Sequence, residues 1–164
     1  MIKYRRAFNE YRSFVYRKQP RPVPHVSVYY GKTNTGKSHS ARQKYPSAYW
    51  LEQDTYGNIW WDGYNGEEHV IVDEFYGWIK FHHLLRYLDK YPCKAVSRTG
   101  VKPLRANKWI FTSNTHPREW YKKLNYETRV TALERRISEI LKFTGINQKP
   151  VPEPVDLQPV YHFD

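Results

Sequence analysis

Eight consecutive residues with the pattern G-x-x-x-x-G-K-S limit the folds open to this chain more than any other feature. They are Gly31, Lys32, Thr33, Asn34, Thr35, Gly36, Lys37 and Ser38. Two glycines at this spacing let successive backbone N–H groups point inward at an anion, and a following helix adds the positive end of its dipole. The lysine supplies charge for the β- and γ-phosphates, and the serine supplies a hydroxyl for magnesium. The pattern predicts a phosphate loop; the alternative is a glycine-containing turn that matches by chance.

The residues on either side of this loop have the periodicities of a strand and a helix. Residues 25–30 alternate apolar and polar side chains, and residues 38–45 predict a helix that stops at Pro46. A strand, a glycine loop and a helix in this order are typical of α/β nucleotide-binding folds. We therefore expect one α/β domain with a mostly parallel central sheet flanked by helices.

The charge balance indicates a polyanionic partner. The 164 residues include 27 Lys and Arg against 16 Asp and Glu, a net charge of +11, and 17% are aromatic. Nucleic acid is the first candidate and a membrane surface the second. No stretch approaches the roughly 20 apolar residues that span a bilayer, and no signal-peptide pattern opens the chain, so we expect a soluble intracellular protein. The single cysteine, Cys93, excludes an internal disulfide and is expected to be a small buried hydrophobe.

The N-terminal segment predicts a basic amphipathic helix. Apolar side chains recur at helical spacing on one face, at Tyr4, Phe8, Tyr11 and Val15. Residues 1–22 carry seven basic residues and one acidic residue, and the prolines in residues 19–24 indicate an extended linker. The helix is either a subunit-contact or nucleic-acid-binding appendage, or a helix packed on the core. The Pro-rich acidic tail, residues 148–164, is expected to be extended.

Two further apolar runs predict buried strands that end in polar residues. Residues 69–75 carry Asp73 and Glu74, and residues 109–114 end at Asn114. An aspartate at the end of a strand beside a phosphate loop can hold magnesium, and the adjacent glutamate can activate water. The amide of Asn114 can hydrogen-bond the γ-phosphate and the attacking water. The alternatives are a solvated acidic turn at residues 73–74 and a strand-capping role for Asn114.

A basic hairpin and two helices complete the interpretation. Residues 97–103 predict a turn between short extended pieces, which either pushes cations into a polyanion or is an ordinary solvated turn. Its basic residues are Arg98, Lys102 and, just after it, Arg105. Residues 79–91 predict a helix whose adjacent histidines, His82 and His83, are expected to have surface or packing roles rather than to bind a metal.

Residues 127–143 have helical spacing, with Gly145 as the stop. This helix would present Arg135 and Arg136. One of them could reach the nucleotide of a neighbouring subunit; the alternative is a solvated face on which Arg135 pairs with Glu139.

The order of these motifs resembles the helicase half of the replication initiator (Rep) proteins of circoviruses and related viruses with small circular single-stranded DNA genomes, a superfamily 3 helicase. The resemblance covers roughly residues 25–143. Its motifs are Tyr30 to Ser38, Trp60-Trp61-Asp62-Gly63-Tyr64 with Gly66-Glu67-Glu68, Val70 to Trp78, Thr112-Ser113-Asn114, and Pro117 to Tyr121.

The resemblance implies an AAA+-like phosphate-loop NTPase that binds ATP and Mg²⁺. By this resemblance residues 31–38 are the Walker A motif, Asp73 and Glu74 are Walker B, and Asn114 is the motif C sensor. Ser38 and Asp73 would hold the magnesium, and Lys37 the phosphates.

The same resemblance implies a homo-hexamer that threads single-stranded DNA during viral rolling-circle replication in the host cell nucleus. Residues 98–105 match the family's B-prime DNA-contacting loop, and Arg135 or Arg136 falls where the family supplies its arginine finger. The N-terminal helix takes the place of an oligomerisation element. The family's nicking endonuclease would lie upstream, and we expect no endonuclease within this chain.

We therefore expect residues 1–22 to form an oligomerisation element, residues 23–147 an ATP-dependent DNA helicase domain, and residues 148–164 a tail. The main alternative is a non-enzymatic nucleic-acid-binding module whose nucleotide site is structural. A small-molecule kinase or a GTPase is less well supported, because no acceptor pocket and no Asn-Lys-x-Asp motif is recognised in the sequence.

Overall fold

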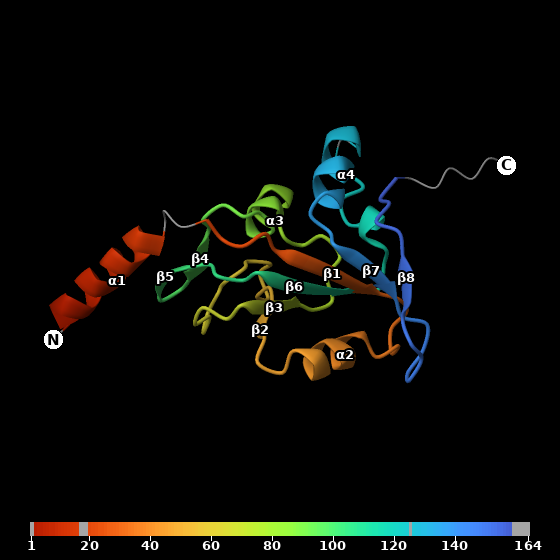
Figure 1. Ribbon diagram of the computed structural model, residues 1–164, viewed down its shortest axis with the longest axis horizontal. Helices are drawn as coiled ribbons and strands as arrows, with labels where there is room; N and C mark the ends of the chain where they lie inside the picture. The colour runs from red at the N-terminus through yellow and green to blue at the C-terminus, as the bar shows by residue number, and fades with distance from the viewer. Residues whose placement is uncertain (1, 17–19, 125, 159–164) are drawn as a thin grey trace.

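A six-stranded sheet organises the computed structural model, which describes residues 2–16, 20–124 and 126–158 (Figure 1). Its strand order is β2-β3-β6-β1-β7-β8. The strands are β1 (His25–Tyr30), β2 (Tyr49–Leu51), β3 (His69–Val72), β6 (Lys108–Ser113), β7 (Glu139–Lys142) and β8 (Val151–Glu153). Five of them run parallel, and β8 pairs antiparallel with β7. The predicted α/β class with a mostly parallel sheet is confirmed.

Helices cover both faces of this sheet, which explains why its central strands are nearly continuous apolar runs. Helix α2 (Lys37–Lys44) lies below the sheet in Figure 1, and α3 (Phe81–Tyr87) and α4 (Tyr126–Glu134) lie above it. On the α2 face, Ala41 packs in a cluster with Ile71 and Ile110. On the other face, Leu84 and Leu133 belong to the larger core.

Strand β1 lies at the centre of the sheet, between β6 and β7. Residues 31–36, which follow it, therefore leave from the carboxyl edge of the sheet, where ligands of open parallel sheets bind. The polar residues that end β3 and β6 emerge at the same edge, because these strands are parallel to β1 and in register with it through β6. The topology thus brings the predicted site residues together from distant parts of the sequence.

The predicted helix over residues 127–143 is wrong in its second half. Helix α4 ends at Glu134, and residues 139–142 form strand β7 beside β1. Spacings of three and four between apolar residues suit a helix, but a short apolar run suits a buried strand equally well. Pairing decides the outcome: Ser138 donates its N–H to Val26 O at 2.8 Å and Phe143 to Tyr30 O at 2.7 Å, so the edge of β1 is satisfied.

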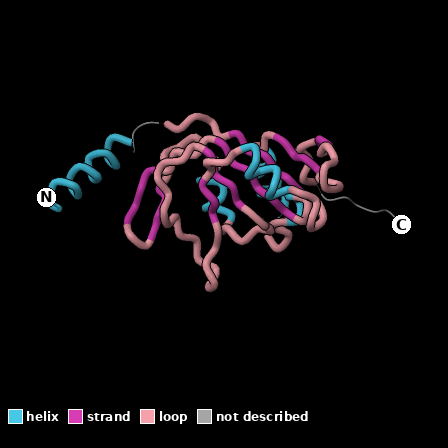
Figure 2. The backbone as a smooth tube through the Cα atoms, turned by 90° about the horizontal axis from the view of Figure 1, so that it is seen from below, coloured by secondary structure: helices cyan, strands magenta, loops and turns pink. Residues whose placement is uncertain are grey.

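The predicted basic hairpin is confirmed as a separate two-stranded sheet, β4 (Lys94–Ser97) paired with β5 (Gly100–Pro103). It extends from the end of the molecule nearest α1 (Ile2–Tyr16), as Figure 2 shows. The predicted N-terminal helix is also confirmed. Its described apolar side chains are exposed, Tyr4 at 83%, Phe8 at 60% and Tyr11 at 66%, so they do not pack on the core of the same chain. The fourth predicted member of this face, Val15, has no described side chain.

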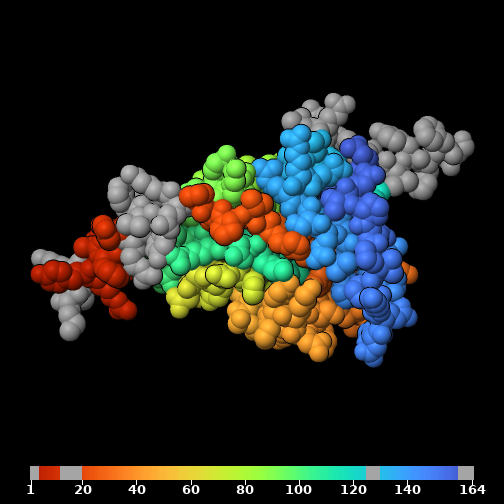
Figure 3. Space-filling view, in the orientation of Figure 1, coloured from red at the N-terminus to blue at the C-terminus, as the bar shows by residue number. Residues whose placement is uncertain are grey.

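The linker that follows α1 has no regular secondary structure but is anchored at Arg21. This side chain is buried and donates to the backbone oxygens of Arg86 at 2.9 Å and Asp89 at 2.5 Å, near the end of α3. A cation there suits the negative end of a helix. In Figure 3 the segment from residue 20 runs across the visible face between the α3 region and the β6 region.

Two shorter differences from the sequence predictions concern the ends of elements. Strand β3 stops at Val72, so residues 73–74 form a turn, and α3 spans only Phe81–Tyr87. Where the structure describes it, up to residue 158, the tail is extended as predicted and contributes β8. Within the described residues no helix combines the length and apolar character needed to cross a bilayer.

Candidate functional site

The two glycines of the loop after β1 are required for different physical reasons. Gly31 has φ 152°, and a Cβ placed there would lie 2.1 Å from the backbone oxygen of Phe143 in the segment after β7. Gly36 has φ 86° and precedes the first residue of α2 in the left-handed region, where open space surrounds it. The first glycine therefore permits close approach of two chains, and the second permits the turn into the helix.

Lys37 reaches back across this loop. Its Nζ donates to Gly31 O at 2.9 Å and to Lys32 O at 2.7 Å, and the side chain is only 7% exposed. Burial lowers the pKa of Lys37, while the charges of Asp73 and Glu74 oppose that shift. The loop therefore holds an ammonium group at its mouth with two carboxylates near it.

Ser38, Asp73 and Thr112 meet through one carboxylate oxygen. Ser38 Oγ and Thr112 Oγ1 each donate to Asp73 Oδ1 at 2.6 Å. The three residues come from the start of α2, the turn after β3 and the end of β6. The predicted proximity of Ser38 and Asp73, which are 35 positions apart in the chain, is therefore present in the structure.

Glu74 follows in a backbone conformation that is uncommon for a residue other than glycine, with φ 48°. Two hydrogen bonds hold it there: Glu74 N–H donates to Thr112 Oγ1 at 2.9 Å, and Trp78 Nε1–H donates to Glu74 O at 3.2 Å. Such a conformation costs on the order of 1–3 kcal/mol and persists where the surroundings enforce it, often at functional sites. The Glu74 residue is exposed and lies beside Asp73 at the loop mouth.

Asn114 directly follows β6 at the same edge of the sheet. It is exposed, and the preceding Ser113 accepts the N–H of Gly31 at 3.1 Å through its backbone oxygen. The ends of β1 and β6 are therefore bonded to each other where the loop begins. This places Asn114 on the loop side of the sheet, as the sequence predicts.

The two candidate arginines after α4 differ in their surroundings. Arg136 pairs with Asp89 at 2.9 Å and donates to Ala132 O at 2.8 Å, whereas Arg135 is exposed. The alternative role for Arg135, pairing with Glu139 one turn later on a helix, is wrong. Glu139 is in strand β7 and accepts a hydrogen bond from Ser27 Oγ at 2.5 Å.

The cations of the hairpin contact acidic and carbonyl groups of residues 54–65. Arg98 pairs with Asp54 at 3.5 Å and Asp62 at 3.3 Å, and Lys102 Nζ donates to Tyr64 O at 2.8 Å. The Arg98 side chain is still 58% exposed, and Arg105 is exposed. These contacts fix the hairpin against the loop that carries Trp60 and Trp61.

Two further predictions concern single side chains. His82 and His83 are exposed on α3, with ring centroids 4.1 Å apart. Cys93 is half-buried rather than fully buried, and burial raises the pKa of its thiol.

The comparisons with known proteins agree with this geometry. A family model described as RNA helicase matches residues 27–115, which is more than half of the chain. The chain belongs to this RNA helicase family. The match includes the glycine loop, Asp73, Glu74, the hairpin and Asn114.

Several relatives of this helicase-family chain are circovirus proteins, each named Replication-associated protein. The Goose circovirus protein is 39% identical over 133 residues, which cover 78% of this chain and 42% of the relative. The Canary circovirus protein is 31% identical over 97% of this chain and 53% of the relative, and the Porcine circovirus 1 protein is 41% identical over 78% and 41%. The chain spans about half the length of these curated relatives or less. The resemblance to circovirus Rep proteins is confirmed.

Sequence reasoning missed a key contact of this helicase-family site, the side chain of Thr112. A hydroxyl at the end of an otherwise apolar strand was the signal that could have identified it. It also missed a cluster beside the loop, in which Tyr30 OH donates to Glu153 Oε2 and the His116 ring packs edge-on against Tyr30 at 5.0 Å. No local signal in the sequence places the tail residue Glu153 next to Tyr30.

Proposed function

We propose that this domain hydrolyses ATP in the glycine loop and uses the energy to move along single-stranded DNA. The observation that carries the proposal is the 2.6 Å hydrogen bond between Ser38 Oγ and Asp73 Oδ1. It sets a hydroxyl and a carboxylate side by side at the mouth of a glycine loop that also holds a buried lysine. Membership of a helicase family supports the same reaction class.

The loop residues would bind the phosphates. Backbone N–H groups of residues 31–38 and the start of α2 favour an anion, and Lys37 would exchange its two carbonyl partners for phosphate oxygens. Its low exposure keeps this charge poorly screened by water. The same loop geometry explains why glycine is needed at positions 31 and 36.

The residues present fit a magnesium ion that is shared with the nucleotide. Ser38 and Asp73 offer hard oxygen ligands, which Mg²⁺ prefers, and no group of three His, Cys, Asp or Glu gathers into a metal site among the described residues. Mg²⁺ usually takes one or two protein ligands together with phosphate oxygens and waters. When bound, the ion would neutralise charge on the phosphates.

Glu74 and Asn114 would prepare the attacking water. Glu74 is exposed beside Asp73 and would accept the proton of the water, while the Asn114 amide would orient it. Arg135 is the better candidate to reach a neighbouring subunit's nucleotide, because Arg136 is paired with Asp89. This role requires a ring of identical subunits, and we propose a homo-hexamer.

The hairpin would contact the nucleic acid. Arg98, Lys102 and Arg105 lie on or next to a projecting β-hairpin, and contacts to phosphates give affinity without sequence preference. Because the relatives are named Replication-associated protein, we propose that the strand is viral DNA during rolling-circle replication in the host nucleus.

Substitution of the proposed base tests the assignment. Glu74→Gln keeps the size of the side chain and removes its basicity, so we expect ATP binding to persist while phosphate release falls by about 100-fold or more. Fluorescent-nucleotide titration and a phosphate-release assay measure the two properties. The matched control is Glu10→Gln, an exposed acid on α1, and normal turnover in Glu74→Gln would remove Glu74 from the mechanism.

The rival function, a binding module with a structural nucleotide site, makes a different prediction. Such a module would bind oligothymidine but release no phosphate when DNA is added. Parallel assays with single-stranded RNA of the same length separate DNA from RNA as the stimulating strand.

A further inference from the structure

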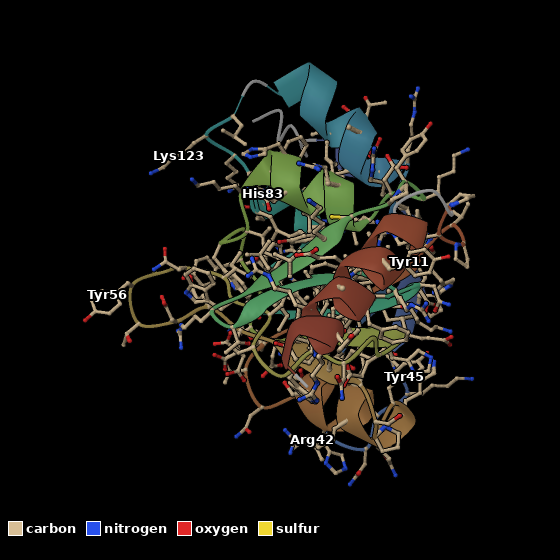
Figure 4. The ribbon with its side chains drawn as sticks, turned by 90° about the vertical axis from the view of Figure 1, so that its left-hand side faces the viewer. Tyr11, Arg42, Tyr45, Tyr56, His83 and Lys123 are labelled. Carbon is tan, nitrogen blue, oxygen red and sulfur yellow. The ribbon has the colours of Figure 1, made fainter. Side chains whose placement is uncertain are left out.

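A large concavity lies at the base of the hairpin. This pocket, of about 800 Å³, is lined by the linker at residues 20–22, the loop at residues 57–60, helix α3 and the ends of β4 and β5. Its lining includes no residue of the glycine loop. Figure 4 shows two of the segments that form it, with His83 on α3 and Tyr56 at the tip of the neighbouring loop. The volume is in the range typical of ligand sites.

The charge of the pocket lining is strongly positive. Exposed basic residues come from three separate segments: Lys80, Arg86, Lys94 and Arg105. Glu68 is the acidic residue among the lining positions, and Arg21 is already bonded to carbonyl groups at the end of α3. Such a surface attracts a phosphate-bearing ligand.

Aromatic rings line the same pocket. Trp60, Trp78 and Tyr87 are each half-buried among its walls. Cations that follow a backbone, interleaved with aromatic rings on which bases stack, are the combination that binds single strands without sequence preference. An acidic peptide would use the cations and leave the rings without a role, so the composition favours a nucleic acid.

Trp78 connects this pocket to the turn that carries Asp73 and Glu74. Its ring lines the pocket, while its Nε1–H donates at 3.2 Å to the backbone oxygen of Glu74, the residue with φ 48°. A ligand that moves the indole therefore acts on a hydrogen bond that supports an unfavourable backbone conformation.

We propose that this pocket binds a short stretch of a single nucleic-acid strand and that Trp78 transmits its occupancy to Glu74. Only the transmission from Trp78 to Glu74 rests on the proposed ATPase function; binding of the strand in the pocket does not. The hairpin cations lie beside the pocket, so a strand held by the hairpin can continue into it. The indole of Trp78 is a positioning group rather than a catalytic one.

Binding is tested without any nucleotide, so that it does not depend on hydrolysis. Polarisation of a fluorescein-labelled oligothymidine is measured for the double variant Lys80→Ala/Arg86→Ala and for a charge-matched control, Lys44→Ala/Lys149→Ala, whose residues lie outside the pocket. We expect about tenfold weaker binding and a salt slope shallower by about 1.4 in the pocket variant alone. Equal effects in both variants would show that binding depends on general surface charge rather than on the pocket, and would overturn the proposal.

The location of the strand is tested by photo-crosslinking. An oligonucleotide that carries 5-iodouridine should link to the peptide containing Trp60 or Trp78. Links found only on hairpin peptides would show that the strand bypasses the pocket. Displacement of the oligonucleotide by polyglutamate of equal charge, at equal concentration, would assign the pocket to acidic peptides instead.

The coupling is tested by Trp78→Phe, which keeps an aromatic ring and removes the N–H donor. We expect oligothymidine affinity to stay within about twofold, because stacking tolerates any ring, while stimulation of phosphate release by the oligonucleotide is lost. Trp78→Ala should lose both. Full stimulation in Trp78→Phe would refute the coupling. If the unmodified protein releases no phosphate, the proposed function fails, and the polarisation and crosslinking results still decide the pocket.

Discussion

Thr112 supports three groups of the candidate site from one position. Its Oγ1 donates to Asp73 and accepts from Glu74 N–H, and its backbone oxygen accepts the N–H of Phe75 at 2.7 Å. The whole turn that carries both carboxylates is thus bonded to the end of β6. Hydrogen bonds of this kind orient the groups that do the chemistry.

Thr112→Val tests this role, because it preserves the shape and removes the hydroxyl. With Glu74 N–H left unpaired and Asp73 deprived of a donor, we expect the free energy of unfolding to fall by about 1–3 kcal/mol. ATP turnover should fall by about tenfold or more. Urea denaturation and phosphate release measure these changes. Thr112→Ser, which keeps the hydroxyl, is the control, and equal losses in both variants would point to packing instead.

His116 is a residue whose charge state the fold controls. Its side chain is 11% exposed, and Nδ1 accepts from Arg118 Nε at 2.9 Å. Burial and then the charge of Arg118 lower the pKa of His116 to about 4, although Glu153 opposes the shift. The imidazole is therefore neutral in the folded chain at neutral pH.

This shift predicts a loss of stability in mild acid. Between its ordinary pKa of 6.5 and the folded value of about 4, the unfolded chain binds a proton at His116 that the folded chain does not. The free energy of unfolding should therefore decrease as pH falls, by about 2 kcal/mol from about pH 7 to about pH 5. Urea denaturation of His116→Asn, whose amide can still accept from Arg118, should show a smaller decrease. An identical pH profile in the variant would assign the change to other groups.

At the scale of elements, the hairpin β4–β5 is more constrained than its exposed position indicates. Arg98 is held by Asp54 and Asp62, and Lys102 by Tyr64 O and Asn65 Oδ1. These contacts orient both cations while leaving much of Arg98 in solvent. Exposed ion pairs add little to stability, typically about 0–1 kcal/mol. These ion pairs therefore orient the hairpin more than they stabilise the fold.

Arg98→Ala and Lys102→Ala should weaken binding of oligothymidine and make its salt dependence shallower by about 0.7 for each lost phosphate contact. Fluorescence polarisation over a series of salt concentrations measures both. Lys149→Ala, an exposed lysine in the β7–β8 connection, is the matched control. An unchanged salt slope in the hairpin variants would indicate that the hairpin is an ordinary solvated turn that does not contact the nucleic acid.

At the scale of the whole molecule, α1 extends away from the sheet with apolar side chains exposed (Figure 1). Exposed aromatic groups on one face of a helix mark an interaction surface. In the proposed ring, contacts between subunits would bury these side chains. The same contacts would bring Arg135 of one subunit toward the nucleotide of its neighbour.

The triple variant Tyr4→Ser/Phe8→Ser/Tyr11→Ser should therefore shift the protein toward monomers in sedimentation velocity, since it removes the apolar contact area. Phosphate release should fall with the loss of assembly. Arg5→Ser/Asn9→Ser, on exposed positions of the same helix, controls for helix propensity. An unchanged assembly in the triple variant would exclude this face from the subunit contact.

The local sequence determined those elements whose periodicity or turn residues lie within a single segment of the chain. The apolar strands β1, β3 and β6, the glycine loop and α2 follow from hydrophobic periodicity and from backbone conformations that glycine permits. Apolar runs of this kind are typical of strands in a parallel sheet covered on both faces, and the polar ends of such strands meet at one edge. The approach of Asp73 to Ser38 was therefore foreseeable.

Only the tertiary structure decided the features that depend on partners distant in sequence. Residues 139–142 suit a helix or a strand by spacing, and the unpaired edge of β1 made them β7. The hydroxyl of Thr112 has its role because the turn after β3 lies beside it, and Trp78 reaches both a pocket and Glu74 because the chain turns back there. Periodicity records which side of an element is buried, whereas hydrogen-bond partners depend on which elements become neighbours.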